Sequence, residues 1–596
     1  MTSSSGSSGS TGSSGSTGSA DPLPDTRMLT ALVQLRGALQ AAALPLDVPG
    51  AQEARTRRTQ MVDQLEDYAI PRQMSAEAPL LVVVGGSTGA GKSTLVNSLV
   101  GHRVTASGVL RPTTRSPVLV HHPDDAPWFG QDRLLPDLTR VAQSTDDPAA
   151  LQLVASEAVP LGIAILDAPD VDSVEERNRT LAGQLLDAAD LWLFVTSAAR
   201  YSDQVPWQHL KQAAERGTAV AVILDRTPAD AVPTVAAHLA RMLASRGLKD
   251  SPLFTVAEAP IGEGGLLDPA AVADIRGWLV SLAGDAEARA AVVRQTLDGT
   301  IRTLAHRSHA VADAAEAQQR AFGDLRADVD AAYDAAAERM LADVRDGSLV
   351  RGEVLARWQE LVGTGELLRS LDQRVGRLRD RVVNAVKGTP QTADRVALAV
   401  EAGAESLALE HAEAAAGAAR DAWAATPAGS ALLDDHGALG RAGTDVPRRA
   451  EQAVREWQQE VVSLIREETS DKRANATMLT FGATGLATAA SVLAMVREAP
   501  ADSPASASAA PGRALLEAVI GPDGARRVVD RAATSLDRRL GTVLADDRRR
   551  WLDVLGHLEL SADAAEDLRE AARRVDDRRF EQARAGAGTS RTAANP

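Results

Sequence analysis

Cysteine is absent from the 596 residues of this chain. The sequence therefore excludes disulfide bonds, thiolate metal sites and cysteine nucleophiles, and it fits a reducing cytoplasm. Aromatic residues are scarce, at 3%, which favours helices packed through small and aliphatic side chains over an aromatic-rich sheet protein. Basic residues do not balance the acidic ones, and the net charge of −16 argues against nucleic acid as a partner.

The chain does show a clear division into parts. Serine, glycine and threonine dominate its first residues, as in a flexible tail, and helical periodicity then runs to Pro71, which we expect to end the second helix. From Leu80 short apolar runs alternate with helical segments, and from about Glu287 only helical periodicity remains. We expect a disordered tail (1–26), N-terminal helices (27–71), an α/β domain (78–283), a helical region (286–585) and a second disordered tail (586–596).

Six apolar runs define the strands of the α/β domain. They are LLVVVG (80–85), VLV (118–120), LGIAILD (161–167), LWLFVT (191–196), TAVAVILD (218–225) and LFTVA (253–257). Continuous apolar strands separated by helices predict a mostly parallel sheet with helices on both faces. In the helical region, apolar residues repeat at three- and four-residue spacing, as at Leu536, Leu540 and Leu544, which predicts helices that bury one stripe in a bundle.

A glycine-rich stretch follows the first of these strands. Residues 85–95 read GGSTGAGKSTL, and Gly86–Ser93 match the pattern GxxxxGK[ST] between a strand and an apolar helix. Glycines let backbone N–H groups surround a phosphate, and the helix N-terminus adds positive charge. Lys92 would bridge the β- and γ-phosphates, and Ser93 would hold Mg²⁺. The predicted nucleotide-binding residues here are Gly86, Ser87, Thr88, Gly89, Ala90, Gly91, Lys92, Ser93 and Thr94.

Two further segments complete the predicted magnesium site. Asp167 ends the strand LGIAILD, where a second magnesium-side carboxylate is expected after such a loop. The segment GVLRPTTRSPVLVHHP (108–123) lies between the two motifs. A nucleotide switch needs a threonine there to complete the metal shell and to sense the γ-phosphate, and Thr113 and Thr114 are the candidates.

These motifs resemble those of the dynamin superfamily of large GTPases, in its bacterial branch. The resemblance rests on the P-loop running into STLVNSLVG, on TTRSP (113–117) before an apolar strand, and on the order of parts. It implies a P-loop GTPase domain at 78–283, with the helices of 27–71 packing on a helical stalk at 286–585. By this match Thr114 is the magnesium and switch threonine, and Thr114 and Lys92 are the catalytic candidates.

The resemblance also implies ligands and partners. GTP and GDP are the expected nucleotides, with Mg²⁺ as the metal, and ATP is the less favoured alternative. Homo- or hetero-oligomers would form through the G domain and the stalk. A stalk tip that contacts lipid would place the protein in the cytoplasm, peripheral to or inserted at the inner face of the cell membrane.

Two departures from the family pattern concern turnover. The family's second switch is D-x-P-G, whereas residues 167–170 read DAPD, and Asp170 brings a carboxylate toward a negatively charged phosphate. Many dynamins have a polar catalytic residue three positions before the P-loop lysine, where this chain has Gly89. We therefore expect slow or altered hydrolysis.

A third departure concerns the base. The guanine-reading motif [NT]-K-x-D is replaced by DRTPAD (225–230). Asp225 and Arg226 fill its first two positions, and Arg226 can stack its planar group over a base. Pro228 stands where an aspartate would accept the guanine N–H groups, and Asp230 is a substitute if the loop bends. Asp225 and Arg226 are therefore included among the nucleotide-binding residues.

The helical region contains an apolar segment, ANATMLTFGATGLATAASVLAMV (474–496). These 23 uncharged residues are long enough to cross a hydrocarbon core of about 30 Å. Alanine, threonine and glycine dominate them, and these residues insert poorly into membranes. Two interpretations stay open, namely a hairpin over 474–521 whose tip contacts a membrane, and a hairpin buried in the bundle.

Three functional hypotheses follow from the sequence. The first is a membrane-associated, dynamin-like GTPase with a slow Mg²⁺-dependent turnover, which couples nucleotide state to movement of the stalk. The second is a soluble scaffold or regulatory protein whose degraded G domain binds nucleotide without efficient turnover, as DAPD and DRTPAD suggest. The third is an ATP-using P-loop enzyme, motivated by the lost guanine reader.

Overall fold

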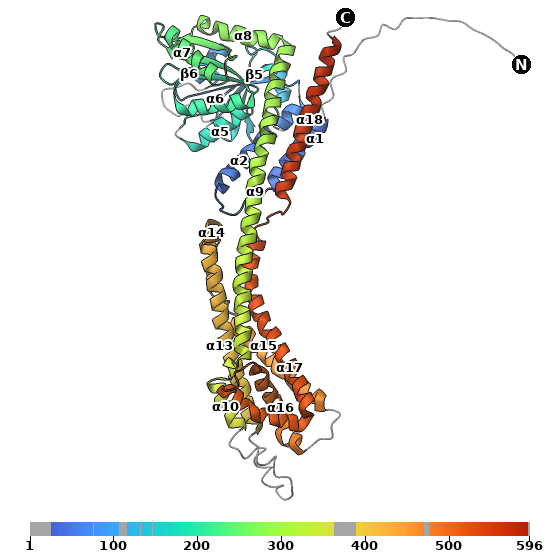
Figure 1. The fold of residues 1–596 in the computed structure, drawn as a ribbon. Helices are drawn as coiled ribbons and strands as arrows, with labels where there is room; N and C mark the ends of the chain where they lie inside the picture. The colour runs from blue at the N-terminus through green and yellow to red at the C-terminus, as the bar shows by residue number, and fades with distance from the viewer. Residues whose placement is uncertain are drawn as a thin grey trace, which may run out of the picture. The chain divides into compact units, whose positions relative to one another are not determined.

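The computed structural model describes the backbone of residues 26–75, 77–105, 116–131, 133–145, 147–173, 175–362, 389–469 and 476–593 (Figure 1). These residues form two compact units. The sheet unit lies within Met1–Ala43, Gln52–Ala315 and Ser561–Pro596, and the helical unit within Leu44–Ala51 and Glu316–Leu560. Each unit has its own buried apolar core.

The sheet unit is built on eight strands in the order β3-β4-β2-β5-β1-β6-β7-β8. β2 pairs antiparallel with β5, and the other neighbouring pairs are parallel. A mostly parallel sheet was the prediction, and it is confirmed. The strands are β1 (Leu80–Gly86), β2 (Val118–His121), β3 (Thr139–Val141), β4 (Ala150–Ala155), β5 (Ile163–Asp167), β6 (Leu191–Ser197), β7 (Ala219–Thr227) and β8 (Leu253–Ala257).

Helices cover both faces of this sheet, because successive side chains of a buried strand point to opposite sides. In β1, Leu81 and Val83 join one apolar core with α5, α6 and α7, whereas Val82 and Val84 join another with α4 and α8. The helices are α4 (Lys92–Val100), α5 (Glu176–Asp187), α6 (Gln204–Arg216), α7 (Val232–Ser245) and α8 (Ala273–Gly284), with 3₁₀ turns η2 (Pro123–Phe129), η3 (Glu263–Gly265) and η4 (Pro269–Val272).

The N-terminal helices form a further core with α18 and the first part of α9. Met28 and Leu32 of α1 pack in one buried cluster with Leu304 and Leu568. The elements are α1 (Thr26–Ala41), α2 (Ala51–Gln64), the π-helix η1 (Leu65–Ala69), α3 (Ile70–Met74), α9 (Ala286–Arg345) and α18 (Ala564–Ala593).

Pro71 does not end the second helix, and that expectation is wrong. The chain stays helical to Met74, because the π-helical turn Leu65–Ala69 is followed directly by α3, which places Pro71 in the first turn of α3. The N–H groups of the first helical turn have no acceptor within the helix, so a proline at this position loses no hydrogen bond. The wide π turn thus makes the proline compatible with helix.

The helical unit is a bundle around one long apolar core. The stripe predicted from Leu536, Leu540 and Leu544 is buried in it, so the bundle prediction is confirmed. Besides α9, the elements are η5 (Ser348–Val350), α10 (Glu353–Val362), α13 (Thr389–Ala424), α14 (Pro427–Asp435), η6 (Gly437–Gly440), α15 (Val446–Thr469), α16 (Ala476–Met495) and α17 (Pro504–Gly556).

Four buried tryptophans tie the helices of this bundle together. The indole N–H of Trp358 donates to the Ser508 carbonyl at 2.8 Å, and that of Trp457 donates to the Ala532 carbonyl at 2.7 Å. Trp423 donates to the Leu325 carbonyl at 2.9 Å. The fourth, Trp551, packs edge-on against Trp423 at 4.8 Å between ring centroids. Each large apolar ring thus gains a polar partner on a neighbouring helix, so its burial leaves no N–H unsatisfied.

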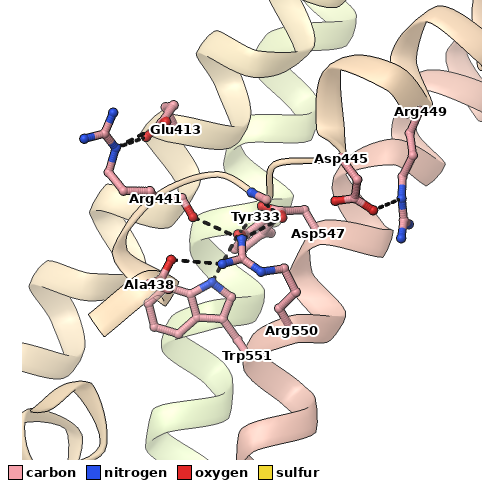
Figure 2. Close-up of polar contacts among 10 residues, drawn as sticks. Tyr333, Glu413, Ala438, Arg441, Asp445, Arg449, Asp547, Arg550 and Trp551 are labelled. Atoms are coloured by element: carbon pink, nitrogen blue, oxygen red, sulfur yellow. Dashed lines mark hydrogen bonds and ion pairs between the residues drawn. The ribbon is translucent and has the colours of Figure 1, made fainter. Parts of the chain in front are cut away.

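A buried carboxylate organises the polar part of this core (Figure 2). Asp547 of α17 accepts hydrogen bonds from the Tyr333 hydroxyl at 2.7 Å and from the Gly443 N–H at 2.9 Å. Arg550 also donates to Asp547, at 3.0 Å. The Tyr333 hydroxyl in turn accepts from the Trp551 indole at 3.1 Å. This network joins α9, α17 and the loop before α15, and it satisfies a charge that would otherwise be costly to bury.

The apolar segment 474–496 lies largely in α16, which has a non-helical residue at Gly482 (φ 65°, ψ 171°). Leu486, Val492 and Met495 are buried in the core of the helical unit, together with Leu516 of α17. This arrangement favours the buried-hairpin interpretation for the second half of the segment. The side chains of 474–481 lie outside the described residues. In the described part of the chain, no helix combines the length and apolar character needed to span a membrane.

Candidate nucleotide-binding site

The predicted phosphate-binding residues form one continuous strand–loop–helix turn. Gly86 ends β1, residues 87–91 form the loop, and Lys92, Ser93 and Thr94 begin α4. Gly86 (φ 147°) has no room for a side chain, since a Cβ there would lie 2.0 Å from the Val195 carbonyl oxygen. The left-handed Gly91 (φ 103°) leads directly into α4. The loop therefore depends on glycine at both positions. The first N–H groups of α4 have no acceptor within the helix, which is the arrangement that a phosphate would require.

Lys92 is buried at the base of this loop, with 5% of its side chain exposed. Its ammonium donates to the carbonyl oxygens of Gly86 at 3.0 Å and Ser87 at 3.1 Å. Its third partner is the Asp170 carboxylate, with which it forms an ion pair. From the sequence we expected Asp170 to repel a phosphate. The structure shows in addition that Asp170 is paired with the lysine that we predicted to bind phosphate.

The segment that carries Asp170 runs beside the loop. Its backbone is fixed to β1, because the Ala168 N–H donates to the Val84 carbonyl at 3.2 Å. Asp172 then accepts from both the backbone N–H of Thr88, at 2.6 Å, and its hydroxyl, at 2.7 Å. Sequence reasoning missed Asp172. The only signal for it is a second acidic residue shortly after the switch motif.

Asp167 lies at the end of β5, fully buried next to the start of α4. Burial raises the pKa of its carboxyl group, an effect opposed by hydrogen bonds from Thr105 and Ser93 and by the charge of Lys92, and reinforced by Asp170. Its Oδ2 accepts from the Thr105 hydroxyl at 2.7 Å, and its Oδ1 has no hydrogen-bond partner among the described residues. A buried carboxylate oxygen without a partner, beside a serine hydroxyl, suits an oxygen-binding cation such as Mg²⁺.

Asp167 also anchors both sides of the predicted switch segment. On the entry side, Thr105 is bonded to Asp167 and is held by Asn97, whose side chain accepts from the Thr105 N–H at 3.0 Å. On the exit side, Val118 of β2 pairs with Asp167 in the antiparallel register. The switch candidates Thr113 and Thr114 lie outside the described residues.

Asp225 and Arg226, the first two residues of the altered base-reading motif, lie next to the loop. A Cβ on Gly91 would be 2.1 Å from Asp225 Oδ2 and 3.6 Å from Arg226 Nε. Burial raises the pKa of Asp225 to about 6, while the backbone N–H and the charge of Arg226 oppose this shift and Glu258 adds to it. Arg226 is exposed and has a left-handed backbone (φ 47°). The structure thus brings both residues to the phosphate loop, on the side of β7.

Pro228 and Asp230 lie in the turn that follows. The Pro228 carbonyl accepts from the Ala231 N–H at 2.9 Å, which closes a turn before α7. Asp230 is exposed within this turn. The chain therefore turns directly after the position of the missing aspartate, with Asp230 on the surface of that turn.

The mostly parallel sheet, its loop between β1 and α4, and the neighbouring carboxylates define a P-loop domain of the GTPase type. Residues 82–134 match the family model described as the dynamin family. This match begins in β1 and includes the whole phosphate loop. The resemblance to the dynamin family, inferred from the motifs, is confirmed over these residues.

Solved structures of bacterial dynamins are similar to this chain over most of its length. One belongs to an oligomerised bacterial dynamin pair described as a mechanism for long-range sensing and tethering of membranes, with 9% identity, a TM-score of 0.35, and coverage of 94% of this chain and 95% of that chain. LeoA, a bacterial dynamin GTPase from ETEC, has 12% identity, a TM-score of 0.23, and coverage of 94% and 97%. Among curated proteins, none matches this chain.

Proposed function

We propose that this chain binds GTP and GDP at the loop between β1 and α4, and that it hydrolyses GTP slowly in the presence of Mg²⁺. One observation carries the proposal. The buried Lys92 lies at the N-terminus of α4, beside the buried Asp167, whose Oδ1 has no hydrogen-bond partner within the described ranges. A phosphate and its cation are both expected to bind at this end of the helix. The dynamin-family match over 82–134 favours guanine as the base.

Several groups in and around the loop have distinct tasks in this proposal. The N–H groups at the start of α4 and the Lys92 ammonium bind the β- and γ-phosphates and stabilise the charge that develops on them. Ser93 and Asp167 would hold the cation, with Thr114 predicted to join them. The metal, when bound, would neutralise phosphate charge. Gly89 supplies no side chain to orient an attacking water, and this lack supports a slow reaction.

Calorimetric titration of the full chain tests the binding proposal. We expect micromolar affinity for GTP and GDP with Mg²⁺, and none for a non-hydrolysable ATP analogue. Lys92→Ala should abolish binding, whereas Lys249→Ala, at an exposed lysine of the same unit, should leave it unchanged. A preference for the ATP analogue would instead support an ATP-using enzyme.

We also propose that nucleotide state is coupled to the helical unit as a stalk, that copies associate through the G domain and stalk, and that the stalk contacts a membrane. The family match supports this part, together with the uncharged composition of 474–485. Liposome flotation of the full chain and of a 474–485 deletion tests the lipid contact. Flotation of the full chain but not of the deletion would support the lipid contact. A full chain that stays in solution would contradict it.

A soluble scaffold that binds nucleotide without efficient turnover is the second candidate. The ion pair between Lys92 and Asp170 favours it, because this pair occupies the group that should stabilise the transferred phosphoryl. Asp170→Gly, which restores the family residue, separates the two candidates. A large rise in the GTP turnover rate supports the GTPase, and an unchanged low rate supports the scaffold.

A further inference from the structure

The Lys92 ammonium has as many acceptors as it has protons to donate. A protonated lysine carries three N–H donors. Here they meet the carbonyl oxygens of Gly86 and Ser87 and the carboxylate of Asp170. A phosphate that is to bind Lys92 must therefore replace one of these partners.

Asp170 is the partner that can be replaced. The two carbonyl oxygens belong to the loop backbone itself and stay beside Lys92 as long as the loop keeps its fold. Asp170 is a side chain on a neighbouring segment, with 20% of its surface exposed compared with 5% for Lys92. A phosphate also carries the same sign of charge as the carboxylate, so the two compete for one cation.

We propose that Asp170 is a specificity-determining residue that acts as a built-in competitor for the nucleotide phosphates. In the nucleotide-free protein its carboxylate occupies the Lys92 ammonium, and a triphosphate binds by displacing it. This inference rests on the proposed function and adds a role for Asp170 that the family pattern, with glycine at this position, does not contain.

The competition should depend on the number of phosphates. Lys92 is placed to bridge the β- and γ-phosphates of a triphosphate, and a diphosphate offers it only one of the two. A triphosphate therefore replaces the lost contact between Lys92 and the carboxylate more completely than a diphosphate does. Asp170 lowers the affinity for both nucleotides, and its removal should favour the triphosphate more.

The displacement also reaches the rest of the loop. Asp172, two residues along the same segment, holds the backbone N–H and the hydroxyl of Thr88. Movement of Asp170 away from Lys92 therefore acts on a segment that is bonded to the loop at a second point. When a phosphate replaces the Asp170 carboxylate at Lys92, residues 170–172 should therefore change position.

Asp170→Asn in the full chain tests the proposal, because it removes the charge and keeps the shape. We measure binding of GDP and of GTPγS by calorimetry with Mg²⁺, using Asp250→Asn, at an exposed aspartate of the same unit, as the charge-matched control. Asp170→Asn should tighten GTPγS binding roughly tenfold, the scale of one charge-assisted contact, and GDP binding by less. The control should bind both nucleotides like the wild type.

The outcomes separate this inference from the proposed function. Equal or weaker GTPγS binding by Asp170→Asn, with a wild type that binds, overturns the inference and leaves the proposed function standing. Nucleotide binding by Asp170→Asn but not by the wild type supports the inference, because the Asp170 carboxylate then keeps the phosphates from Lys92. If neither protein binds, both ideas fail. Thermal unfolding without nucleotide checks the pair itself, since Asp170→Asn should lower the Tm relative to Asp250→Asn, and an unchanged Tm would contradict it.

Discussion

The Asp225 carboxylate lies so close to Gly91 that a Cβ on this glycine would come within 2.1 Å of Asp225 Oδ2. Two motifs that are far apart in the sequence, the phosphate loop and the altered base-reading segment, are therefore packed against each other at a position where any side chain would have to displace the Asp225 carboxylate. The loop therefore needs glycine at position 91 for two reasons, the left-handed backbone and the close contact with Asp225.

Gly91→Ala should lower nucleotide affinity strongly, because the new methyl group displaces Asp225 or the loop itself. Gly101→Ala is the matched control, since Gly101 caps the other end of α4 with a similar left-handed backbone (φ 84°), and a methyl group added there would meet no atom within 4 Å. We expect the control to lose about 1 kcal/mol of stability through backbone strain alone. Calorimetry and urea unfolding measure both effects, and equal nucleotide affinities for the two variants would contradict the packing argument.

Asp167→Asn should remove most of the dependence of GTP binding on Mg²⁺. The amide keeps an oxygen for the Thr105 hydroxyl but loses the charge that a cation requires. Titrations with GTP in Mg²⁺ and in EDTA measure this dependence. Thr105→Val removes the hydrogen bond and keeps the carboxylate, so it should retain the metal dependence, and a loss of that dependence in Thr105→Val would point to a structural role for the pair instead.

The stability of the sheet unit should fall as pH rises through the range in which Asp67 ionises. Burial raises the pKa of Asp67 from 3.8 to about 7, with added repulsion from Asp137, Asp63 and Glu66 and an opposing hydrogen bond from Gln184. Because the folded state keeps this proton longer than the unfolded state, the contribution is fully present below pH 4 and is lost as pH approaches 7.

Asp67→Asn should therefore become more stable than the wild type as pH rises from 4 to 8, by on the order of 2–4 kcal/mol. Thermal unfolding across this pH range gives the comparison. Asp250→Asn, at an exposed position, should follow the wild type at every pH. A constant difference between Asp67→Asn and the wild type would show that Asp67 does not titrate in this range.

In the helical unit, Asp547→Ala should cost roughly 3 kcal/mol of stability, because it leaves the Gly443 N–H and the Tyr333 hydroxyl without their acceptor. Urea unfolding measures the loss. Asp523→Ala changes an aspartate of the same helix α17 that is 84% exposed, and it should change stability by less than about 0.5 kcal/mol. Similar losses for both variants would rule out the buried network as the cause.

The strands that the sequence predicts share one property, which is a continuous apolar run. β3 and β4 were missed because Thr139–Val141 has only three residues and the apolar run of Ala150–Ala155 is interrupted by Gln152. Both lie at one side of the sheet, where partly exposed strands need fewer apolar residues. Burial on two faces can be read from composition, whereas burial on one face of a short strand cannot.

The candidate site likewise contains features that the sequence predicts and contacts that it does not. The loop from Gly86 to Ser93 and the strand-end Asp167 follow from local patterns, because backbone conformation and strand position fix them. The contacts of Asp170 with Lys92 and of Asp172 with Thr88 join residues about 80 positions apart. Such contacts depend on how the segment after β5 crosses the loop, and a single sequence contains no local signal for that crossing.

Asp167 has a consequence for the segment between Thr105 and Val118 that does not depend on the conformation of that segment. Thr105 on one side and Val118 on the other are both attached to this one residue, by a hydrogen bond and by strand pairing. A substitution at Asp167 would therefore act on two described points of the chain at once, Thr105 after α4 and Val118 at the start of β2.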